Sequence, residues 1–457
     1  MGLLDILLYY ILVPLFILGV AINIHEFGHF IVAKLLGMRI DAYSFFGLGP
    51  RLFGFRWGHT DYRISAIPLG AYVKLYGDES NSGLEGKDAQ GEPVPDSELY
   101  ELRPRWQKFL VMIGGPFMNV VLALAIPFIG GMLYGVPAML SPIVSTVEAN
   151  SAAQQAGMQT GDRIVSFNKE ENPTWQRIVM NAALYPEQKV PVVVERSGQR
   201  VPLEVTPSKI NVNGHDVGDL GIEPDFGVSP VIIDFVEPNT PAAEAGLQPG
   251  DRIIAVNEIN LRNNRQLQKA VQESAGSPLQ LTVDRNDQIM NVTTQARKLS
   301  DGNQRLGVKF SQMRAPLEPA GISTAASYAV NTNLEVLRLT GTALGQVFTG
   351  NRAARDAVSG PVGIFKESAN AAQSAGWEGV FSIMMLISLS LGVFNLLPIP
   401  MLDGGQIMVL AIEAVMALFG LKLSMLVRER IQLAGFAIIM LLMVFVMFND
   451  ISRLVSR

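Results

Sequence analysis

An apolar run near the start of the chain has the length of a membrane span, yet it carries two histidines and a glutamate. The run extends from about Leu3 to Leu36, and a span needs about 20 residues. Placing a carboxylate such as Glu26 at membrane depth costs roughly 2.5–3.5 kcal/mol. Ionisable residues kept at that depth mark functional sites. The run therefore predicts a membrane helix that carries a site.

The spacing of the three residues indicates a metal site. Residues four apart lie on one face of a helix, so His25 and His29 can direct nitrogens to one ion. Glu26 projects beside them, where its carboxylate can accept a proton from a water molecule at the metal. The pattern is typical of a zinc-dependent hydrolase, which here would work inside a bilayer.

The composition fits a chain that combines membrane spans with folded modules outside the membrane. Of its 457 residues, 49% are hydrophobic, and the mean hydropathy is +0.26. A net charge of −5 argues against a nucleic-acid surface. The chain has no cysteine, which excludes disulfides and thiolate ligands. The first run lacks a basic region and a cleavage site, so we expect a retained span and not a signal peptide.

Three further apolar runs are long enough to cross a bilayer. They extend from about Phe109 to Tyr134, from Val380 to Ile399 and from Ile431 to Phe448. A shorter run, Ile407 to Leu421, contains Glu413 and is expected to pack on the bundle or lie at its edge. The predicted fold class is a polytopic α-helical membrane protein with about four transmembrane helices.

Basic residues in the short connections predict the orientation of the spans. They gather in two connections, which hold Arg39, Arg51, Arg56, Arg63, Lys74, Arg103, Arg105 and Lys108 in one and Lys422, Arg428 and Arg430 in the other. Both connections are expected to be cytoplasmic. The long middle region and both termini then lie on the outer side, although Arg453 and Arg457 oppose this weakly.

The middle region contains a duplicated segment. Residues 150–168 and 239–257 align at an offset of 89 residues, and ten of nineteen positions are identical. Such a period indicates a duplicated domain and not a solenoid unit. In each copy a small-residue helix is followed by a Gly-Asp turn and an isoleucine-led strand. The copies resemble the PDZ domain in its bacterial protease-associated form, and the repeated residues are expected to build the fold without binding a ligand.

Two other segments have weaker patterns. Residues 51–75 contain strand-like stretches around a turn at Gly58 and His59 and predict a β-hairpin, although Pro68 and Gly70 interrupt it. Between Ser323 and Gln346, leucines recur at helical spacing. This pattern predicts either an amphipathic helix on a membrane face or a packed connector.

Two histidines leave a catalytic zinc site incomplete, because such sites typically have three protein ligands. The chain has two other histidines, but His59 lies in a polar turn and His215 in a Gly/Asn-rich loop. Asp403 is a carboxylate in an apolar setting at the end of the third span. Pro398 and Pro400 precede it, and a broken helix at membrane depth is tolerated where it lines a cavity. Asp403 is therefore the predicted third ligand.

The chain resembles the site-2-protease type of intramembrane zinc metalloprotease over nearly its whole length. The resemblance rests on motifs that extend from HEFGH at 25–29 to NLLPIPMLDGG at 395–405. Between them are Gly114-Gly115-Pro116 with Asn119, the two PDZ-like copies and Ser359-Gly-Pro-Val-Gly-Ile364, and Phe448-Asn-Asp-Ile-Ser-Arg-Leu454 follows near the end. Gln406 departs from relatives, which often carry histidine there, but this position is not a ligand.

The resemblance implies a role for each matching residue. His25, His29 and Asp403 would bind Zn²⁺, and Glu26 would be the catalytic base. Asn395 would hold substrate backbone near the metal. Asn119 would support the core and would, with Asn395, belong to the substrate-binding residues. The hairpin at about 51–75 would be membrane-associated and would pair with substrate as an added strand.

The resemblance also gives expected domains. Residues 1–36, 107–135, 378–405 and 430–449 would be the four spans, the third carrying the aspartate. The other parts would be the hairpin region at 37–106, PDZ domains at 136–210 and 220–300, an amphipathic helix with connector at 315–375, and a short apolar helix with loop at 406–429.

The implied activity is a zinc metalloendopeptidase that cuts single-span membrane proteins already trimmed on their outer side. Anti-sigma factors of an envelope stress response and remnant signal peptides would be the substrates, and the PDZ pair would act as a size filter. The enzyme would be a monomer among the lipids of a bacterial inner membrane. Its PDZ domains and termini would be periplasmic, and its active site would lie near the cytoplasmic side.

Two other functions fit parts of the pattern. A PDZ-based tethering or chaperone module could use the metal only for structure, but such a site has no use for a base such as Glu26. A metal transporter could place polar residues in its spans. That function predicts repeated helix pairs and a ligand-lined path, whereas the sequence contains one metal constellation.

Overall fold

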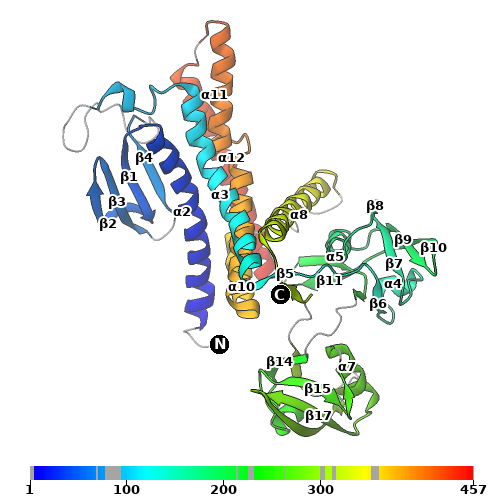
Figure 1. Ribbon diagram of the computed structural model, residues 1–457. Coiled ribbons are helices and arrows are strands. Elements are labelled where there is room, and N and C mark those ends of the chain that lie inside the picture. Colours follow the sequence, from blue (N-terminus) through cyan, green and yellow to red (C-terminus); the bar gives the residue numbers. More distant parts are fainter. Residues whose placement is uncertain are drawn as a thin grey trace. The chain divides into compact units, whose positions relative to one another are not determined.

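The computed structural model describes residues 5–67, 70–77, 94–212, 215–224, 231–261, 263–298, 304–310, 315–350, 360–421 and 423–455. Pro68, Ser359, Lys422 and Arg457 lie outside these ranges. The chain divides into two compact units. Unit 1 comprises Met1–Tyr134 and Ala320–Arg457, and unit 2 comprises Gly135–Pro319 (Figure 1).

Long helices form the framework of unit 1. They are α2 (Val13–Leu35, preceded by the π-helical turn η1, Ile6–Leu12), α3 (Arg105–Tyr134), α8 (Ile322–Phe348), α10 (Pro361–Asn395), α11 (Asp403–Leu418) and α12 (Met425–Val455). Among the described residues, four helical stretches are long and apolar enough to cross a membrane: Leu7–Leu35, Arg105–Tyr134, Pro361–Asn395 and Leu426–Asp450. The four expected spans are therefore confirmed as candidate transmembrane helices.

Glycines bring α2 and α3 into close contact. A Cβ atom added at Gly28 would lie 2.1 Å from the carbonyl oxygen of Gly114, and one added at Gly114 would lie 2.7 Å from that of Gly28. Small residues at such crossings let helix backbones approach closely in a membrane. Helix α10 also packs on α2 and α3, with Ile17 and Met384 in a shared buried cluster.

The end of the third span differs from the sequence-based prediction. Helix α10 already begins at Pro361, so part of the connector expected at 315–375 is helical. Gly376, with φ of 56°, breaks this element into two helices, so the second helix begins close to the predicted start of the span at 378. The helix ends at Asn395, and Asp403 begins α11. The expectation of a third span at 378–405 that carries the aspartate is therefore wrong, because Pro398 and Pro400 stop the helix before it.

Asp450 of α12 holds the beginning of α10. Its buried carboxylate accepts hydrogen bonds from the backbone N–H groups of Gly360 (3.1 Å) and Gly363 (3.0 Å). A carboxylate is stabilised at a helix N-terminus because the backbone dipoles there present positive charge. This contact joins the last helix to the one that leads to the aspartate.

Residues 40–75 form a four-stranded sheet beside α2. Its strands, in the order β2-β3-β1-β4, are β2 (Leu48–Trp57), β3 (Thr60–Ile67), β1 (Ile40–Phe46) and β4 (Tyr72–Leu75). Strands β2 and β3 pair antiparallel across the turn at Gly58 and His59, while β1 is parallel to β3. Strand β4 is an edge strand that pairs only with β1 among the described residues. Phe30 of α2 packs on Tyr43 and Tyr62 of the sheet.

Helix α8 packs on α3. The buried side chain of Asn333 donates a hydrogen bond to the carbonyl oxygen of Ala123 in α3 (3.0 Å). Val336 and Leu337 pack against a buried cluster that includes Ala123. Of the two alternatives for residues 323–346, these contacts favour a packed helix.

Unit 2 contains two modules with the same order of elements. The first has β6 (Val144–Val147), α4 (Ala152–Gln155), β7 (Arg163–Phe167), β8 (Glu170–Glu171), α5 (Trp175–Leu184), β9 (Val190–Arg196), β10 (Gln199–Val205) and β13 (Ile222–Pro224). The second has β14 (Val231–Val236), α6 (Pro241–Glu244), β15 (Arg252–Val256), β16 (Ile259–Asn260), α7 (Asn264–Glu273), β17 (Pro278–Arg285), β18 (Gln288–Gln295) and β21 (Val308–Phe310). Unit 2 also contains three pairs of short strands. These are β11 (Ser208–Val212) with β12 (His215–Asp219) in the first module, β19 (Arg297–Lys298) with β20 (Gln304–Arg305) in the second, and β5 (Val136–Pro137) with β22 (Leu317–Glu318) at the two ends of the unit.

The module boundaries correct the ranges expected from the sequence. Strand β13, at Ile222–Pro224, pairs with β6 and so belongs to the first module, not to a second domain that begins at 220. Strand β21, at Val308–Phe310, pairs with β14, which extends the second module beyond 300. In each copy the closing strand comes last and lies outside the duplicated segment, so the repeat did not reveal it.

Each module is held by the same ion pair. Arg196 donates to both carboxylate oxygens of Asp162, and Arg285 does the same to Asp251, at 2.7–2.8 Å. Burial alone would raise the pKa of Asp251, but hydrogen bonds from Arg285 and from the Gln248 N–H outweigh it and hold that pKa below its usual value. The pair therefore stabilises the fold at neutral pH, and this contribution is lost as the pH falls through the lowered pKa.

We expect Asp251→Ala to destabilise the second module by about 2 kcal/mol, because hydrogen bonds to charged groups contribute about 1.5–3 kcal/mol each. Urea-dependent proteolysis of the full chain in detergent, with cut sites mapped by mass spectrometry, measures the change. Glu273→Ala, which removes an exposed pair with Lys269 in the same module, should have little effect. The difference between wild type and Asp251→Ala should shrink in acid; a constant difference would contradict the assignment.

Candidate metal centre

Helix α2 presents two imidazoles on one face. His25 and His29 lie one turn apart and are buried. Their Nε2 atoms are 3.3 Å from each other. The two rings cross nearly edge to face, with 4.8 Å between their centres. The four-residue spacing thus brings the two nitrogens together, as expected.

Asp403 faces the same point from the beginning of α11. Its Oδ2 lies 3.1 Å from Nε2 of His25, and its Oδ1 lies 3.5 Å from Nε2 of His29. Gly404 and Gly405 allow this placement, since a Cβ at either would lie 2.2–2.3 Å from backbone atoms of Leu396 or Ile399. Both glycines are helical. Their role is to allow close approach to the segment that precedes α11.

The three side chains fit a zinc ion. One ligand atom from each lies within 4.8 Å of the others, and this is the metal-capable cluster found among the described residues. Tetrahedral ligands at about 2.0–2.1 Å from zinc are separated by roughly 3.3–3.4 Å, which is close to the distance between the two Nε2 atoms (3.3 Å) and to that between His25 Nε2 and Asp403 Oδ2 (3.1 Å). Oδ2 of Asp403 is buried and, apart from the His25 imidazole, has no hydrogen-bonding partner in the described part of the chain.

Helix α3 shapes the opposite wall of the centre. A Cβ atom at Gly115 would lie 2.4 Å from Nε2 of His29 and 2.8 Å from Cε1 of His25. No side chain can occupy that position while the imidazoles stay in place. The carbonyl oxygen of Val111, on the same helix, lies 2.7 Å from Nδ1 of His29.

Glu26 lies next to the cluster and contacts the sheet. Its Oε2 accepts a hydrogen bond from the backbone N–H of Val73 in β4 (3.1 Å). Tyr43, on the neighbouring strand, approaches the same helix and donates to the carbonyl oxygen of Asn23 (3.4 Å). The edge strand β4 therefore lies directly beside the carboxylate.

The two predicted asparagines lie on different sides of His25. Nδ2 of Asn395, at the end of α10, is 3.3 Å from Nε2 of His25. Nδ2 of Asn119, in α3, is 3.2 Å from Nδ1 of the same ring. Asn395 is half-buried, whereas Asn119 is fully buried. This burial favours a supporting role for Asn119 over direct contact with a substrate.

The two remaining histidines lie away from the centre. His59 is exposed in the turn between β2 and β3. His215 begins β12 and pairs with Val212, so it lies in a hairpin strand and not, as expected, in a loop. Neither belongs to the metal-capable cluster.

Several contributors to the centre were not predicted from the sequence. The Val111 carbonyl and the Val73 N–H are backbone groups, and the type of a residue does not indicate what its backbone will contact. Ser388 of α10 donates to the backbone oxygen of Asn119 (2.9 Å). Gly115 belongs to the motif Gly114-Gly115-Pro116. It lies four residues before Asn119 in an apolar run, and this spacing was the signal that both residues share the helix face that meets the site.

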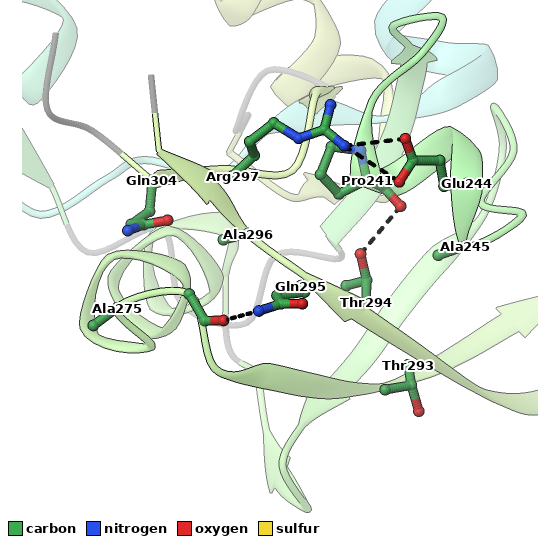
Figure 2. A pocket seen from close by; sticks show the side chains of 11 residues that line it. Pro241, Glu244, Ala245, Ala275, Thr293, Thr294, Gln295, Ala296, Arg297 and Gln304 are labelled. Atoms are coloured by element: carbon green, nitrogen blue, oxygen red, sulfur yellow. Dashed lines mark hydrogen bonds and ion pairs between the residues drawn. The ribbon is translucent and has the colours of Figure 1, made fainter. Parts of the chain in front are cut away.

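A hollow of about 680 Å³ lies in the second module of unit 2. Its lining includes Glu244 and Arg297, which form an ion pair (3.1 Å), and Thr294, which donates to the carbonyl oxygen of Pro241 (Figure 2). The polar groups that Figure 2 joins with dashed lines are thus already paired with one another by hydrogen bonds and an ion pair. None of the predicted site residues lines this hollow.

Comparison with known proteins agrees with this centre. The family model "Peptidase family M50" matches residues 13–442. Regulator of sigma-E protease RseP from Escherichia coli (strain K12) is 29% identical over 459 residues, 96% of this chain and 97% of that protein. Protease RseP from Yersinia pestis is 30% identical with the same coverage. A Treponema pallidum protein named as a zinc metalloprotease is 27% identical over 97% of this chain and 99% of its own length.

The chain therefore belongs to peptidase family M50, the site-2 protease family of zinc-dependent metallopeptidases. Solved structures match a smaller part. The PDZ domain of an SdrC-like protein from Listeria monocytogenes matches 18% of this chain and 85% of its own, at 16% identity and a TM-score of 0.17. A second one, from Listeria innocua, matches 19% of this chain and 100% of its own, at 13% identity and a TM-score of 0.18.

We expect Gly115→Ala to weaken zinc retention and to reduce proteolysis about 100-fold, because displacing reacting groups by about 1 Å can have that effect. Metal analysis after dialysis and cleavage of a single-span membrane peptide measure the two quantities. Gly130→Ala is the matched control, since a Cβ at Gly130 on the same helix meets nothing within 4 Å. Equal zinc content and activity in both variants would contradict the steric role of Gly115.

Proposed function

We propose that this zinc metalloprotease cleaves single-span membrane proteins within the bilayer. The observation that carries the proposal is the meeting of His25, His29 and Asp403 within 4.8 Å, with two of the three on a candidate transmembrane helix. Glu26, whose carboxylate is suited to proton transfer, lies on the same helical turn. Family membership supports the peptidase chemistry.

In this proposal His25, His29 and Asp403 bind Zn²⁺. The bound ion supplies Lewis acidity toward the scissile carbonyl and the attacking water. Glu26 accepts the proton of that water at a carboxylate oxygen and delivers it to the leaving amide nitrogen. Oε1 has no hydrogen bond in the described residues, whereas Oε2 is held by Val73. The side chain is therefore oriented by the sheet and keeps one oxygen for proton transfer.

Asn395 and strand β4 would position the substrate. The Asn395 amide lies beside His25 on the metal-facing side of the ring, where it can donate to a substrate carbonyl oxygen. A membrane helix must unwind before cleavage, and its freed amide groups then need partners. Strand β4 is an edge strand in contact with Glu26, so an added substrate strand would lie beside the catalytic base.

The sheet is suited to contact with lipid. Phe53, Phe55 and Trp57 of β2 are exposed by 60–72%. An exposed aromatic face of this kind indicates a membrane or a protein partner. We assign it to the membrane, because the sheet packs on α2, itself a candidate span.

The two modules of unit 2 are proposed to be tandem PDZ domains outside the membrane. The basic residues of the short connections support a periplasmic position for these modules and for both termini at an inner membrane. They follow α3 and lead to α8 along the chain, so a bulky outer domain of a substrate would meet them. The proposed substrates are trimmed anti-sigma factors of the envelope stress response and remnant signal peptides. The similarity to proteins named regulator of sigma-E protease supports this class.

Glu26→Gln is expected to keep zinc and to lose cleavage by about 10²–10⁴-fold, the usual contribution of a positioned base. The reason is that the amide keeps the hydrogen bond from Val73 but cannot accept the proton. Zinc analysis and cleavage of a single-span peptide in detergent, with a chelator control, measure both effects. Asp403→Ala serves as the contrast, since it should lose zinc as well. Retained proteolysis in Glu26→Gln would remove Glu26 from the mechanism.

Deleting residues 141–298 with a short linker should leave the zinc site formed and allow cleavage of substrates that keep a large outer domain. The size filter predicts this gain because the deletion removes the bulk but none of the metal-binding residues. One substrate with a full and with a trimmed outer domain is compared in both enzymes. If the deleted enzyme cuts the trimmed form normally and still leaves the full form uncut, the filter proposal fails. Loss of both would favour an adaptor role.

A further inference from the structure

Each zinc-binding imidazole must keep its proton on the nitrogen that does not face the metal. A neutral imidazole carries one N–H, and its other nitrogen has the lone pair. In this centre the Nε2 atoms of His25 and His29 face each other and Asp403. Both rings therefore need the proton on Nδ1, and the group that accepts from Nδ1 decides whether it stays there.

Helix α3 supplies this acceptor for His29. The Val111 carbonyl oxygen lies 2.7 Å from Nδ1. A carbonyl oxygen can only accept, so Nδ1 must be the donor and Nε2 keeps its lone pair. The backbone of α3 thereby sets the tautomer of this ring.

His25 has a different neighbour. Its Nδ1 faces the side-chain amide of Asn119, two helical turns beyond Val111 on α3, at 3.2 Å. An amide can present either its N–H₂ or its oxygen, and turning it by 180° exchanges the two in place. With the nitrogen toward the ring, the proton of His25 is driven to Nε2, where it blocks metal binding. With the oxygen toward the ring, the proton stays on Nδ1.

Ser388 of α10 favours the second arrangement. Its hydroxyl donates to the backbone oxygen of Asn119 (2.9 Å) and lies 3.5 Å from the other end of the amide. With its proton directed to the backbone, Oγ has lone pairs free to accept from the Asn119 N–H₂. Asn119 and Ser388 are both fully buried, so no water replaces these partners, and unpaired buried polar groups are costly.

We propose that Asn119 is a positioning residue that holds the proton of His25 on Nδ1 through its side-chain oxygen and so directs the Nε2 lone pair to zinc. Ser388 fixes the orientation of that amide. The inference rests on the proposed ligand role of His25. It gives α3 one acceptor for each histidine of α2, a backbone oxygen for His29 and a side-chain oxygen for His25.

A pair of substitutions at one position tests the proposal. Asn119→Leu keeps the approximate size but removes the acceptor, and zinc affinity should fall 10–100-fold, as for other groups that support metal ligands. Asn119→Asp retains an acceptor toward Nδ1 and one toward the Ser388 hydroxyl, so zinc affinity should stay at or above that of wild type. Competition with a chelator of known affinity measures each value on the full chain in detergent.

Asn333→Leu is the matched control. Asn333 is another buried asparagine of unit 1, and its amide donates to Ala123 on the same helix α3. It does not contact either histidine, so its loss should leave zinc affinity unchanged. Equal losses in Asn119→Leu and Asn333→Leu would show a general packing effect and overturn the proposal.

The position of the proton can be observed without activity. NMR of ¹⁵N-histidine-labelled enzyme gives few signals because the chain has four histidines. In the double variant His59→Gln/His215→Gln, the remaining signals come from His25 and His29. Both rings of zinc-loaded enzyme should carry the proton on Nδ1. In Asn119→Leu the His25 signals should show loss of the fixed Nδ1 proton while those of His29 stay unchanged. Unchanged His25 signals would overturn the proposal.

Failure of the proposed ligand set gives a different result. If the His25→Ala variant binds zinc as tightly as the wild-type enzyme does, the ligand assignment is wrong. If zinc binding requires His25 but Asn119→Leu matches wild type, only the role of Asn119 is wrong. Should Asn119→Leu fail to fold, Ser388→Ala, which frees the amide without added bulk, should still weaken zinc binding, and no change there would also contradict the proposal.

Discussion

The crossing of α2 and α3 determines where the groups of the metal centre lie. Gly28 and Gly114 let the two backbones touch, and this contact brings α3 within hydrogen-bonding distance of both histidines of α2. The Val111 carbonyl, the Gly115 backbone and the Asn119 side chain meet the imidazoles from one face of α3. In a membrane, where apolar side chains gain nothing by leaving lipid, such close packing is a main source of helix association. The same contact therefore supports both the fold and the ligand geometry.

The sequence predicted the parts of the site that depend on local geometry. His25 and His29 follow from the four-residue spacing of one helix, and Asp403 follows from a carboxylate placed among apolar residues and prolines. The four spans were recognisable for the same reason, since length and apolarity are local properties. The duplicated segment likewise revealed the common order of short helix, glycine turn and strand in the two modules.

The parts that were missed depend on contacts between distant segments. Nothing in the residue type of Val111 or Val73 indicates that its backbone will meet a histidine or a glutamate. The closing strands β13 and β21 pair with strands far earlier in the chain, and the duplicated segment ends before them. The helical part of α10 before Gly376 was not predicted because it is less apolar than a span, and its beginning is held by Asp450 from the last helix.

The position of Asp403 has a consequence for how the enzyme is made. The histidines lie in α2, whereas the aspartate begins α11, which is synthesised several hundred residues later. Until then a metal ion could find only two of its three protein partners. The order of synthesis would therefore delay completion of the proposed centre until α11 has been made. In the proposed centre, a bound ion would join two segments that lie far apart in the sequence, α2 and the beginning of α11.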